Sequence, residues 1–433
     1  MRKAAIGLSA ALLCASGGAA PPTPVSSGTK DALVADAVRP VAAPRAQLAP
    51  IARGAAAVTR GEATQPRRQG SVDAGWQEAA ARAADLLIAN PAPAVLALGE
   101  SAHDDPISLG WRNAVTLELV RRDAVRLVLF ESGFAEARML DDYVLGRGSL
   151  TPATIAQGFT NGLGLFAETR ALVEALRQVN AGRPAATRVR IAGVDLGAGG
   201  PWGSAPGMAP IDCALEALPD LDRGDLRAAF EKAVQPGLEG AAVTPAHVAD
   251  YRRLTAHLKA RMPRSASADQ RQCLRVVAQG IAMLETLPRG FPGPALPADA
   301  WRTIEARDRA MAENALALSA RGQGKPLLLL AHLSHVAKTP MRGPRWARLT
   351  QSPRSTGYFL HARLDGRYRA LLEVRPPDPQ GCPAVGRRGS PDAWLVAADM
   401  PAGDCAVAVN GSDSQLLDLR RSADAIQVLG RAK

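Results

Sequence analysis

Four short apolar runs, each followed by a titratable residue, constrain the fold of this chain more than any other feature. Buried parallel strands read as near-continuous apolar runs. In an open parallel sheet, binding sites lie beyond the carboxyl ends of the strands. The pattern therefore predicts a parallel sheet whose carboxyl edge carries the functional site. The runs span residues 95–99, 125–130, 189–194 and 327–331, the second and third interrupted only by Arg126 and Arg190, and they lead into Glu100, Glu131, Asp195 and His332.

The first run leads into a turn that combines carboxylates with a histidine. His103 follows Glu100 by three residues, and Asp104 and Asp105 come next. Nearby carboxylates raise the pKa of a histidine and orient its ring. We therefore expect His103 to be a functional residue rather than a structural one.

Two glutamates end the first two runs. Glu100 and Glu131 are predicted at equivalent ends of two adjacent strands, where they would share protons or hold a cationic group. Alternatively, each caps the following helix or pairs with an arginine such as Arg112.

The last run is followed by a pair of histidines. His332 and His335 lie three residues apart and would share one face of a helix. With His103 and a glutamate they offer zinc-binding side chains, so a metal-dependent hydrolase or peptidase is an alternative. Because HExxH, GxSxG and Walker motifs are absent, we predict no metal, no cofactor and no serine nucleophile. Asp195 is a further site candidate, although an aspartate there also commonly begins a turn.

Helical patterns alternate with the apolar runs and predict an α/β fold, a mainly parallel sheet flanked by helices. Residues 211–298 show helical patterns without a strand, which predicts a helical insertion. Alternating polar and apolar residues in 356–363 and 367–374 predict a β-hairpin around Asp365-Gly366. The other expected helices span residues 76–87, 107–122, 135–145, 165–180 and 299–320.

The amino terminus has the pattern of a secretory signal peptide over residues 1–20. Arg2 and Lys3 precede an apolar stretch that is too short to span a bilayer, and small residues follow. Lipidation at Cys14 is a weaker alternative, because Leu13 fits a lipoprotein signal poorly. We expect a periplasmic or secreted protein without a membrane segment after signal removal.

Composition divides the rest of the chain. A stretch rich in Ala, Pro, Arg and Thr, without aromatic residues, predicts a disordered linker. The expected parts are a linker over residues 21–72, a catalytic domain over 73–375 with its insertion, and a C-terminal extension over 376–433.

Four cysteines follow the signal region. An even number in an exported protein fits two disulfides. Of the three possible connectivities, we predict the pairs that are local in sequence, Cys213–Cys273 and Cys382–Cys405.

The net charge of +11 is a weak indication of an anionic partner. Only seven of the 52 basic residues are lysine, and aromatic residues make up 4% of the chain. The first indicates a general composition bias, and the second disfavours a surface that stacks bases. We expect a small-molecule substrate and no nucleic-acid partner.

Several segments, in order along the chain, resemble motifs of the erythromycin esterase family. Residues 99–103 resemble its Gly-Glu-x-x-His signature, and Arg112 stands where the family has an arginine. The similarity covers roughly residues 90–375, and Asp104, Val194 and Leu333 depart from the usual pattern. The other matching segments are 129–131, 192–195, 331–335 and the helix that carries Arg307, Asp308, Met311 and Asn314.

The resemblance implies an α/β core with a helical insertion and a metal-independent hydrolase in which His103 activates water. We expect an exported enzyme that cleaves an ester or lactone, with antibiotic resistance as one role of the family. The oxyanion would be stabilised by protonated His332 or by Arg112. A periplasmic haem- or ligand-binding protein that uses His103 and His332 is the non-enzymatic alternative. The expected catalytic residues are His103, Glu100, Glu131 and His332, and the expected substrate-binding residues are Arg112, His335 and Asp195.

Overall fold

The computed structural model describes one compact unit, which lies within Gly70–Lys433. The predicted signal peptide, the predicted linker, Cys14 and Cys382 fall outside the described ranges. No helix in those ranges is long and apolar enough to cross a membrane. The described ranges are 74–199, 205–239, 241–287, 297–343, 346–374, 394–396, 404–409 and 413–428.

Strands of the described chain form a sheet in the order β3-β2-β6-β1-β7-β11-β8. Every neighbouring pair is parallel except β11 with β8, which confirms the predicted fold class. The four apolar runs are β1, β2, β3 and β6. The strands are β1 (Val95–Glu100), β2 (Leu127–Gly133), β3 (Arg190–Asp195), β6 (Leu327–His332), β7 (Tyr368–Val374), β8 (Trp394–Val396) and β11 (Ala425–Val428).

Strand β6 lies between β1 and β2, so the prediction that Glu100 and Glu131 end adjacent strands is wrong. After β2 the chain adds β3 at the edge, passes through the insertion and then returns to the centre of the sheet. The apolar runs show where strands lie along the chain, but they carry no information on which strands become neighbours.

Helices cover the sheet, and two short strand pairs lie outside it. Most of the helices match the predicted segments, whereas α5, α7, α13 and α15 were not predicted as helices. The principal helices are α2 (Ala74–Ile88), α3 (Pro106–Arg121), α4 (Phe134–Val144), α5 (Pro152–Gln157), α6 (Ala167–Ala181), α7 (Ala209–Leu215), α8 (Asp220–Leu238), α9 (Pro245–Arg261), α10 (Ala268–Thr286), α11 (Trp301–Ala317), α12 (Leu333–Val336), α13 (Thr356–Leu364) and α15 (Leu419–Ser422). Short 3₁₀ helices span Leu163–Leu165, Ala185–Thr187, Ser319–Gly322 and Asp365–Arg367. The extra strand pairs are β4 (Ala198–Gly199) with β5 (Ala205–Pro206), and β9 (Asp404–Val409) with β10 (Asp413–Asp418).

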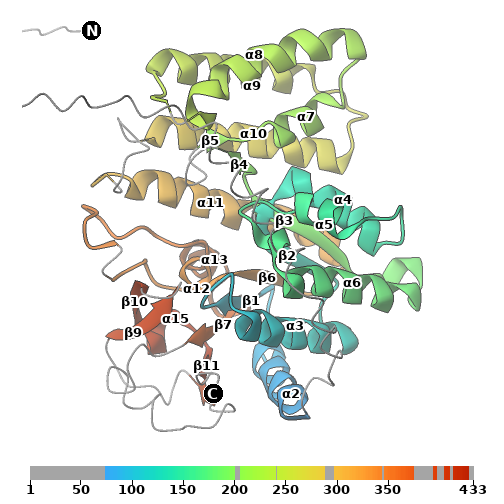
Figure 1. The fold of residues 1–433 in the computed structure, drawn as a ribbon, viewed down its shortest axis with the longest axis vertical. Coiled ribbons are helices and arrows are strands. Elements are labelled where there is room, and N and C mark those ends of the chain that lie inside the picture. The colour runs from blue at the N-terminus through green and yellow to red at the C-terminus, as the bar shows by residue number, and fades with distance from the viewer. Residues whose placement is uncertain are drawn as a thin grey trace, which may run out of the picture. The chain divides into compact units, whose positions relative to one another are not determined.

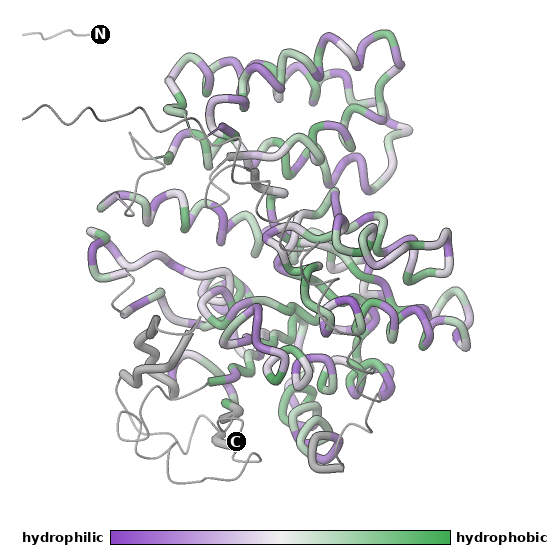
Figure 2. The backbone as a smooth tube through the Cα atoms, in the orientation of Figure 1, coloured by the Kyte–Doolittle hydropathy of each residue, from purple (hydrophilic) through white to green (hydrophobic). Residues whose placement is uncertain are grey.

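Both faces of the sheet are buried, which explains why its central strands β1, β2 and β6 are apolar up to the polar residues near their carboxyl ends. In β1, Leu96 and Leu98 pack with side chains of α2, α3 and α6. Val95 and Ala97 face the opposite way, into a cluster with α10, α11 and α13. Figure 1 shows these helices around the sheet, and Figure 2 shows mixed purple and green on the helices.

Helices α7 to α10 form the predicted helical insertion between β3 and β6. They lie together at the top of Figure 1. A buried apolar cluster joins them to the sheet through Phe230, Tyr251 and Val194.

The predicted hairpin over residues 356–374 is wrong. Its first half is helix α13, and its second half is β7, which pairs in parallel with β1. Ser355 caps α13 by accepting the backbone N–H of Tyr358. Asp365, with φ 49°, then ends the helix in the left-handed region. A short segment with mixed polarity is compatible with both the helical and the strand period. Here the Ser355 cap stabilises a helix over the first half, and only the second half pairs with the sheet.

Cys213 of α7 and Cys273 of α10 form a disulfide with Cα atoms 6.0 Å apart, which confirms this predicted pair. A cross-link over a separation of 60 residues stabilises a fold by about 4 kcal/mol in the chain-entropy account. The other predicted pair lies outside the described side chains, since the side chain of Cys405 in β9 is not among them.

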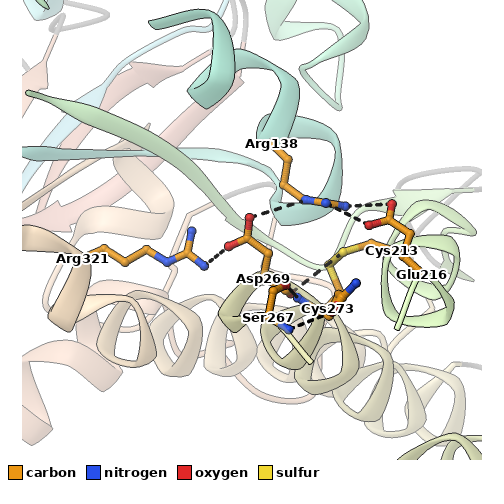
Figure 3. The surroundings of a disulfide bond; sticks show 8 residues. Arg138, Cys213, Glu216, Ser267, Asp269, Cys273 and Arg321 are labelled. Atoms are coloured by element: carbon orange, nitrogen blue, oxygen red, sulfur yellow. Dashed lines mark hydrogen bonds and ion pairs between the residues drawn. A yellow bond between two sulfur atoms is a disulfide. The ribbon is translucent and has the colours of Figure 1, made fainter. Parts of the chain in front are cut away.

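Ion pairs beside this disulfide connect the insertion with the α/β core (Figure 3). Asp269 of α10 binds Arg321, and it lies 3.7 Å from Arg138 of α4. Arg138 also pairs with Glu216 at 2.9 Å. Because α4 begins directly after β2, these contacts tie the insertion to the element that follows Glu131.

Candidate active site

Five neighbouring strands end on polar side chains at the carboxyl edge of the sheet. Their order across the sheet brings together residues that are far apart in sequence, as the apolar runs predicted. Glu100 lies opposite His332 in the pairing of β1 with β6. In sheet order from β3 to β7, the polar residues at or next to these ends are Asp195, Glu131, His332, Glu100 and Glu373.

His103 is held by Glu100, which Arg112 holds in turn. The Nδ1 atom of His103 lies 2.6 Å from Glu100 Oε1, and Arg112 Nη1 donates to Glu100 Oε2 at 2.6 Å. Glu100 and Arg112 are buried, whereas the His103 side chain remains 27% exposed. Among Glu100, Arg112 and His103, the candidate general base His103 is therefore the most exposed side chain.

The charges around His103 set its protonation. Burial alone would lower the pKa of His103, but the hydrogen bond with Glu100 and the charge of Glu131 raise it above 6.5. Burial alone would raise the pKa of Glu100, but the Arg112 charge and the His103 hydrogen bond lower it. Glu100 thus stays ionised and keeps the Nδ1 proton on His103, which leaves Nε2 as the basic atom.

Local packing fixes the turn that carries His103. A Cβ at Gly99 would lie 2.9 Å from the Leu333 Cα, so the end of β1 admits only glycine without a shift. Asp105 caps α3 by accepting from Ile107 N at 3.1 Å, and Pro106 begins the helix.

Glu131 is the centre of the second cluster. Its Oε1 accepts from Arg307 Nη2 at 3.0 Å and lies 3.2 Å from His335 Nε2. Its Oε2 accepts the backbone N–H of His332 at 3.0 Å and lies 3.8 Å from His103 Nε2. A register shift between β2 and β3 at this point re-aims the end of β2. Burial alone would raise the pKa of Glu131, but the charges of His335, His103 and Arg307 hold it well below its usual range.

Asp195 binds Arg307 and is completely buried. Arg307 Nη2 and Nε donate to Asp195 Oδ2 at 2.6 and 3.0 Å. Asp195 was predicted to bind substrate, and here it anchors the arginine that also contacts Glu131.

His335 lies between two carboxylates. Its Nδ1 is 2.7 Å from Asp308 Oδ1, and its Nε2 faces Glu131. Burial alone would lower the pKa of His335, but Asp308 and Glu131 raise it to about 10. His335 is therefore a permanent cation at neutral pH, and both of its N–H groups are committed.

His332 is neutral, in contrast to the protonated state expected from the sequence. Burial and the charge of His103 lower its pKa to about 3. Its Nδ1 accepts the backbone N–H of Ser334 at 3.2 Å, and its Nε2 lies 3.2 Å from the carbonyl oxygen of Ser101. Nε2 therefore carries the proton. His332 cannot supply a positive charge to an oxyanion, and Arg112, which pairs with Glu100, is not the nearest cation to Glu131.

Arg307, Asp308 and Glu373 were missing from the predicted site. Arg307 and Asp308 appeared only as matches to a family motif. Glu373 ends an apolar run in the same way as Glu100 and Glu131, but the mistaken hairpin concealed this signal. No group of three His, Cys, Asp or Glu side chains among the described residues is arranged to hold a metal ion.

Fold and site together define an α/β protein with a histidine–carboxylate site at the carboxyl edge of a parallel sheet. The family model for erythromycin esterase matches residues 120–371. The chain belongs to the erythromycin esterase family, and membership supports a hydrolase at the level of the family. No curated protein sequence matches the chain.

Solved structures share the fold. A Bacillus cereus protein superposes with a TM-score of 0.60 at 18% identity, covering 78% of this chain and 88% of that one. A succinoglycan biosynthesis protein gives 0.59 at 16% identity, covering 80% and 89%. A mutant of the erythromycin esterase EreC in its open conformation gives 0.57 at 17% identity, covering 79% and 91%.

Proposed function

We propose that this protein is an exported hydrolase that cleaves an ester or lactone bond, with His103 as the general base that activates water. The observation that carries the proposal is the difference between the three histidines. His335 is fixed as a cation and His332 as a neutral donor, whereas His103 is partly exposed and has a basic Nε2. Of the three, His103 alone combines partial exposure with a ring nitrogen that is not committed as a donor.

Glu100 and Glu131 support this role. Glu100 fixes the ring through Nδ1, so Nε2 faces Glu131 Oε2 at 3.8 Å. A water molecule in contact with both atoms would be held by the carboxylate and deprotonated by the imidazole.

Arg307 is the candidate oxyanion donor. Its Nε and Nη2 are taken by Asp195 and Glu131. Its Nη1 lies 3.5 Å from His335 Nε2, which is itself a donor because His335 is protonated. Within the ranges that the structure describes, the Nη1 N–H groups therefore have no acceptor and remain available to a developing negative charge.

The proposed reaction is a direct hydrolysis. Water attacks the carbonyl carbon while His103 Nε2 takes one of its protons, and the resulting oxyanion accepts from Arg307 Nη1. The tetrahedral intermediate then expels the alcohol oxygen, which receives the proton from His103. The products are a carboxylic acid and an alcohol, or a hydroxy acid from a lactone.

Two further observations support details of the proposal. The Cys213–Cys273 disulfide is typical of an oxidising compartment outside the cytosol. The site carboxylates already have cationic partners in Arg112, Arg307 and His335, which makes a divalent cation unnecessary for charge balance.

Purified protein should hydrolyse at least one member of a panel of carboxylic esters and lactones, macrolides included. Activity should survive prolonged chelation, because the base and the oxyanion donor are protein groups. An enzyme inactivated by chelation and restored by Zn²⁺ or Mn²⁺ would instead use a metal-bound hydroxide. Metal analysis of the same samples separates this outcome from simple denaturation.

The rate should show a bell-shaped dependence on pH. It should rise with pH through a midpoint above 6.5, because the raised pKa of His103 keeps it protonated and inactive to higher pH. It should fall near pH 10, because His335 then loses its proton and Nε2 becomes an acceptor for Arg307. Circular dichroism at each pH distinguishes titration from unfolding. A midpoint well below 6.5 would contradict the assignment of His103.

A further inference from the structure

Glu373 is a fully buried carboxylate beside the site that the proposed reaction does not use. It is the penultimate residue of β7, and the pairing of Gly99 with Leu372 places it at the level of Glu100. Its Oε1 accepts from Ser101 Oγ at 2.8 Å, and its Oε2 accepts from Ser108 Oγ.

These two serines bracket the turn that carries His103. Ser101 directly follows Glu100 at the end of β1, and Ser108 lies in the first turn of α3. One carboxylate on a third element therefore holds both ends of the turn. The same turn is linked to β6, because the carbonyl oxygen of Ser101 lies 3.2 Å from His332 Nε2.

We propose that Glu373 is a positioning residue that holds the His103 turn against the sheet and so fixes the general base beside Glu100 and Glu131. This inference rests on the proposed function of the same site. A buried charge costs free energy unless it is satisfied, and this one is satisfied by the segment whose position matters for hydrolysis.

The mechanism of positioning is geometric. The His103 ring depends on a 2.6 Å contact with Glu100 and a 3.8 Å approach to Glu131. If the turn is released, both carboxylates become more distant from the ring, and its pKa moves toward the ordinary value of about 6.5. A displacement of about 1 Å at a reacting group can lower a rate by roughly 100-fold.

The test uses the full chain with Glu373→Met, Glu373→Gln, Ser101→Ala and Ser108→Ala. Methionine keeps the volume and removes both acceptors, so kcat should fall by roughly 10- to 100-fold with little change in KM. Glu373→Gln should lose less kcat than Glu373→Met, because the amide can accept a hydrogen bond from one serine hydroxyl and donate one to the other. The kcat of each serine variant should lie between those of wild type and Glu373→Met. The same serine substitution should lower kcat by a smaller factor when Glu373 is already replaced by methionine.

The titration of His103, followed by NMR without substrate, separates positioning from stability. Its midpoint should fall in Glu373→Met and recover in Glu373→Gln. The control is Asp141→Asn, which removes a buried carboxylate paired with Arg190 at the opposite edge of the sheet. The control should lower thermal stability but leave kcat and the midpoint unchanged.

An unchanged His103 midpoint in folded Glu373→Met and in both serine variants would overturn the proposal, even if hydrolysis is confirmed. If no substrate is hydrolysed by the wild type, the NMR titration still decides the role of Glu373. Failure of the proposed function and failure of this inference are therefore distinct results.

Discussion

Replacing His103 with asparagine should lower kcat by roughly 10²- to 10⁴-fold, the scale expected when a general base is lost. The asparagine side chain can keep a hydrogen bond to Glu100 but cannot accept a proton from water. Glu100 also keeps its 2.6 Å ion pair with Arg112, so the variant leaves no unpaired buried carboxylate. Steady-state kinetics on the best substrate of the panel measures the effect.

A second histidine provides the matched control. His257 lies exposed on α9 of the insertion, so His257→Asn should keep wild-type turnover. Wild-type turnover in a correctly folded His103→Asn protein would remove His103 from the role of base. Equal losses in both variants would point to a general effect of substitution on the preparation.

Replacing Arg307 with methionine should damage both stability and catalysis. Asp195 is completely buried and would lose the cation that binds it at 2.6 Å. Removing one partner of a buried ion pair costs about 3–5 kcal/mol. Loss of an oxyanion donor lowers kcat by roughly 10²- to 10³-fold. Urea unfolding and kinetics on the same preparations measure the two effects.

Two further variants separate these roles. Arg307→Met combined with Asp195→Asn removes both charges, so stability should recover substantially while kcat stays low. Arg307→Lys restores the charge without the planar fork, so it should recover stability more than rate. A lysine variant with wild-type kcat would show that a specific Nη1 donor is not required.

The position of most site residues could be predicted because the signal is local. Each of the four apolar runs becomes a buried strand, and the first titratable residue after each run lies at the carboxyl edge of the sheet. His103 and Arg112 contact Glu100 from only 3 and 12 residues away, so spacing along the chain was informative.

Neighbour relations and charge states could not be predicted in this way. The position of β6 between β1 and β2 depends on contacts across the whole fold. The neutral state of His332 depends on its burial and on the backbone N–H of Ser334, which only the completed α12 places at Nδ1. The sequence does not point to Glu373, because a hairpin over residues 356–374 would pair β7 with the segment before it instead of placing it in the parallel sheet.

The origin of the site residues on separate strands has a consequence for the order in which the site assembles during folding. Glu131 binds the backbone of His332 from 201 residues away, and Ser101 binds Glu373 from 272 residues away. Contacts over such separations form late and slow the folding of a chain. A chain that ends before α11 holds Glu131 and Asp195 without Arg307, His332 and His335, the groups that bind them. The complete site therefore needs α11, β6 and β7 to join the first strands, and the earlier strands alone hold only Glu100, His103 and Arg112 in contact.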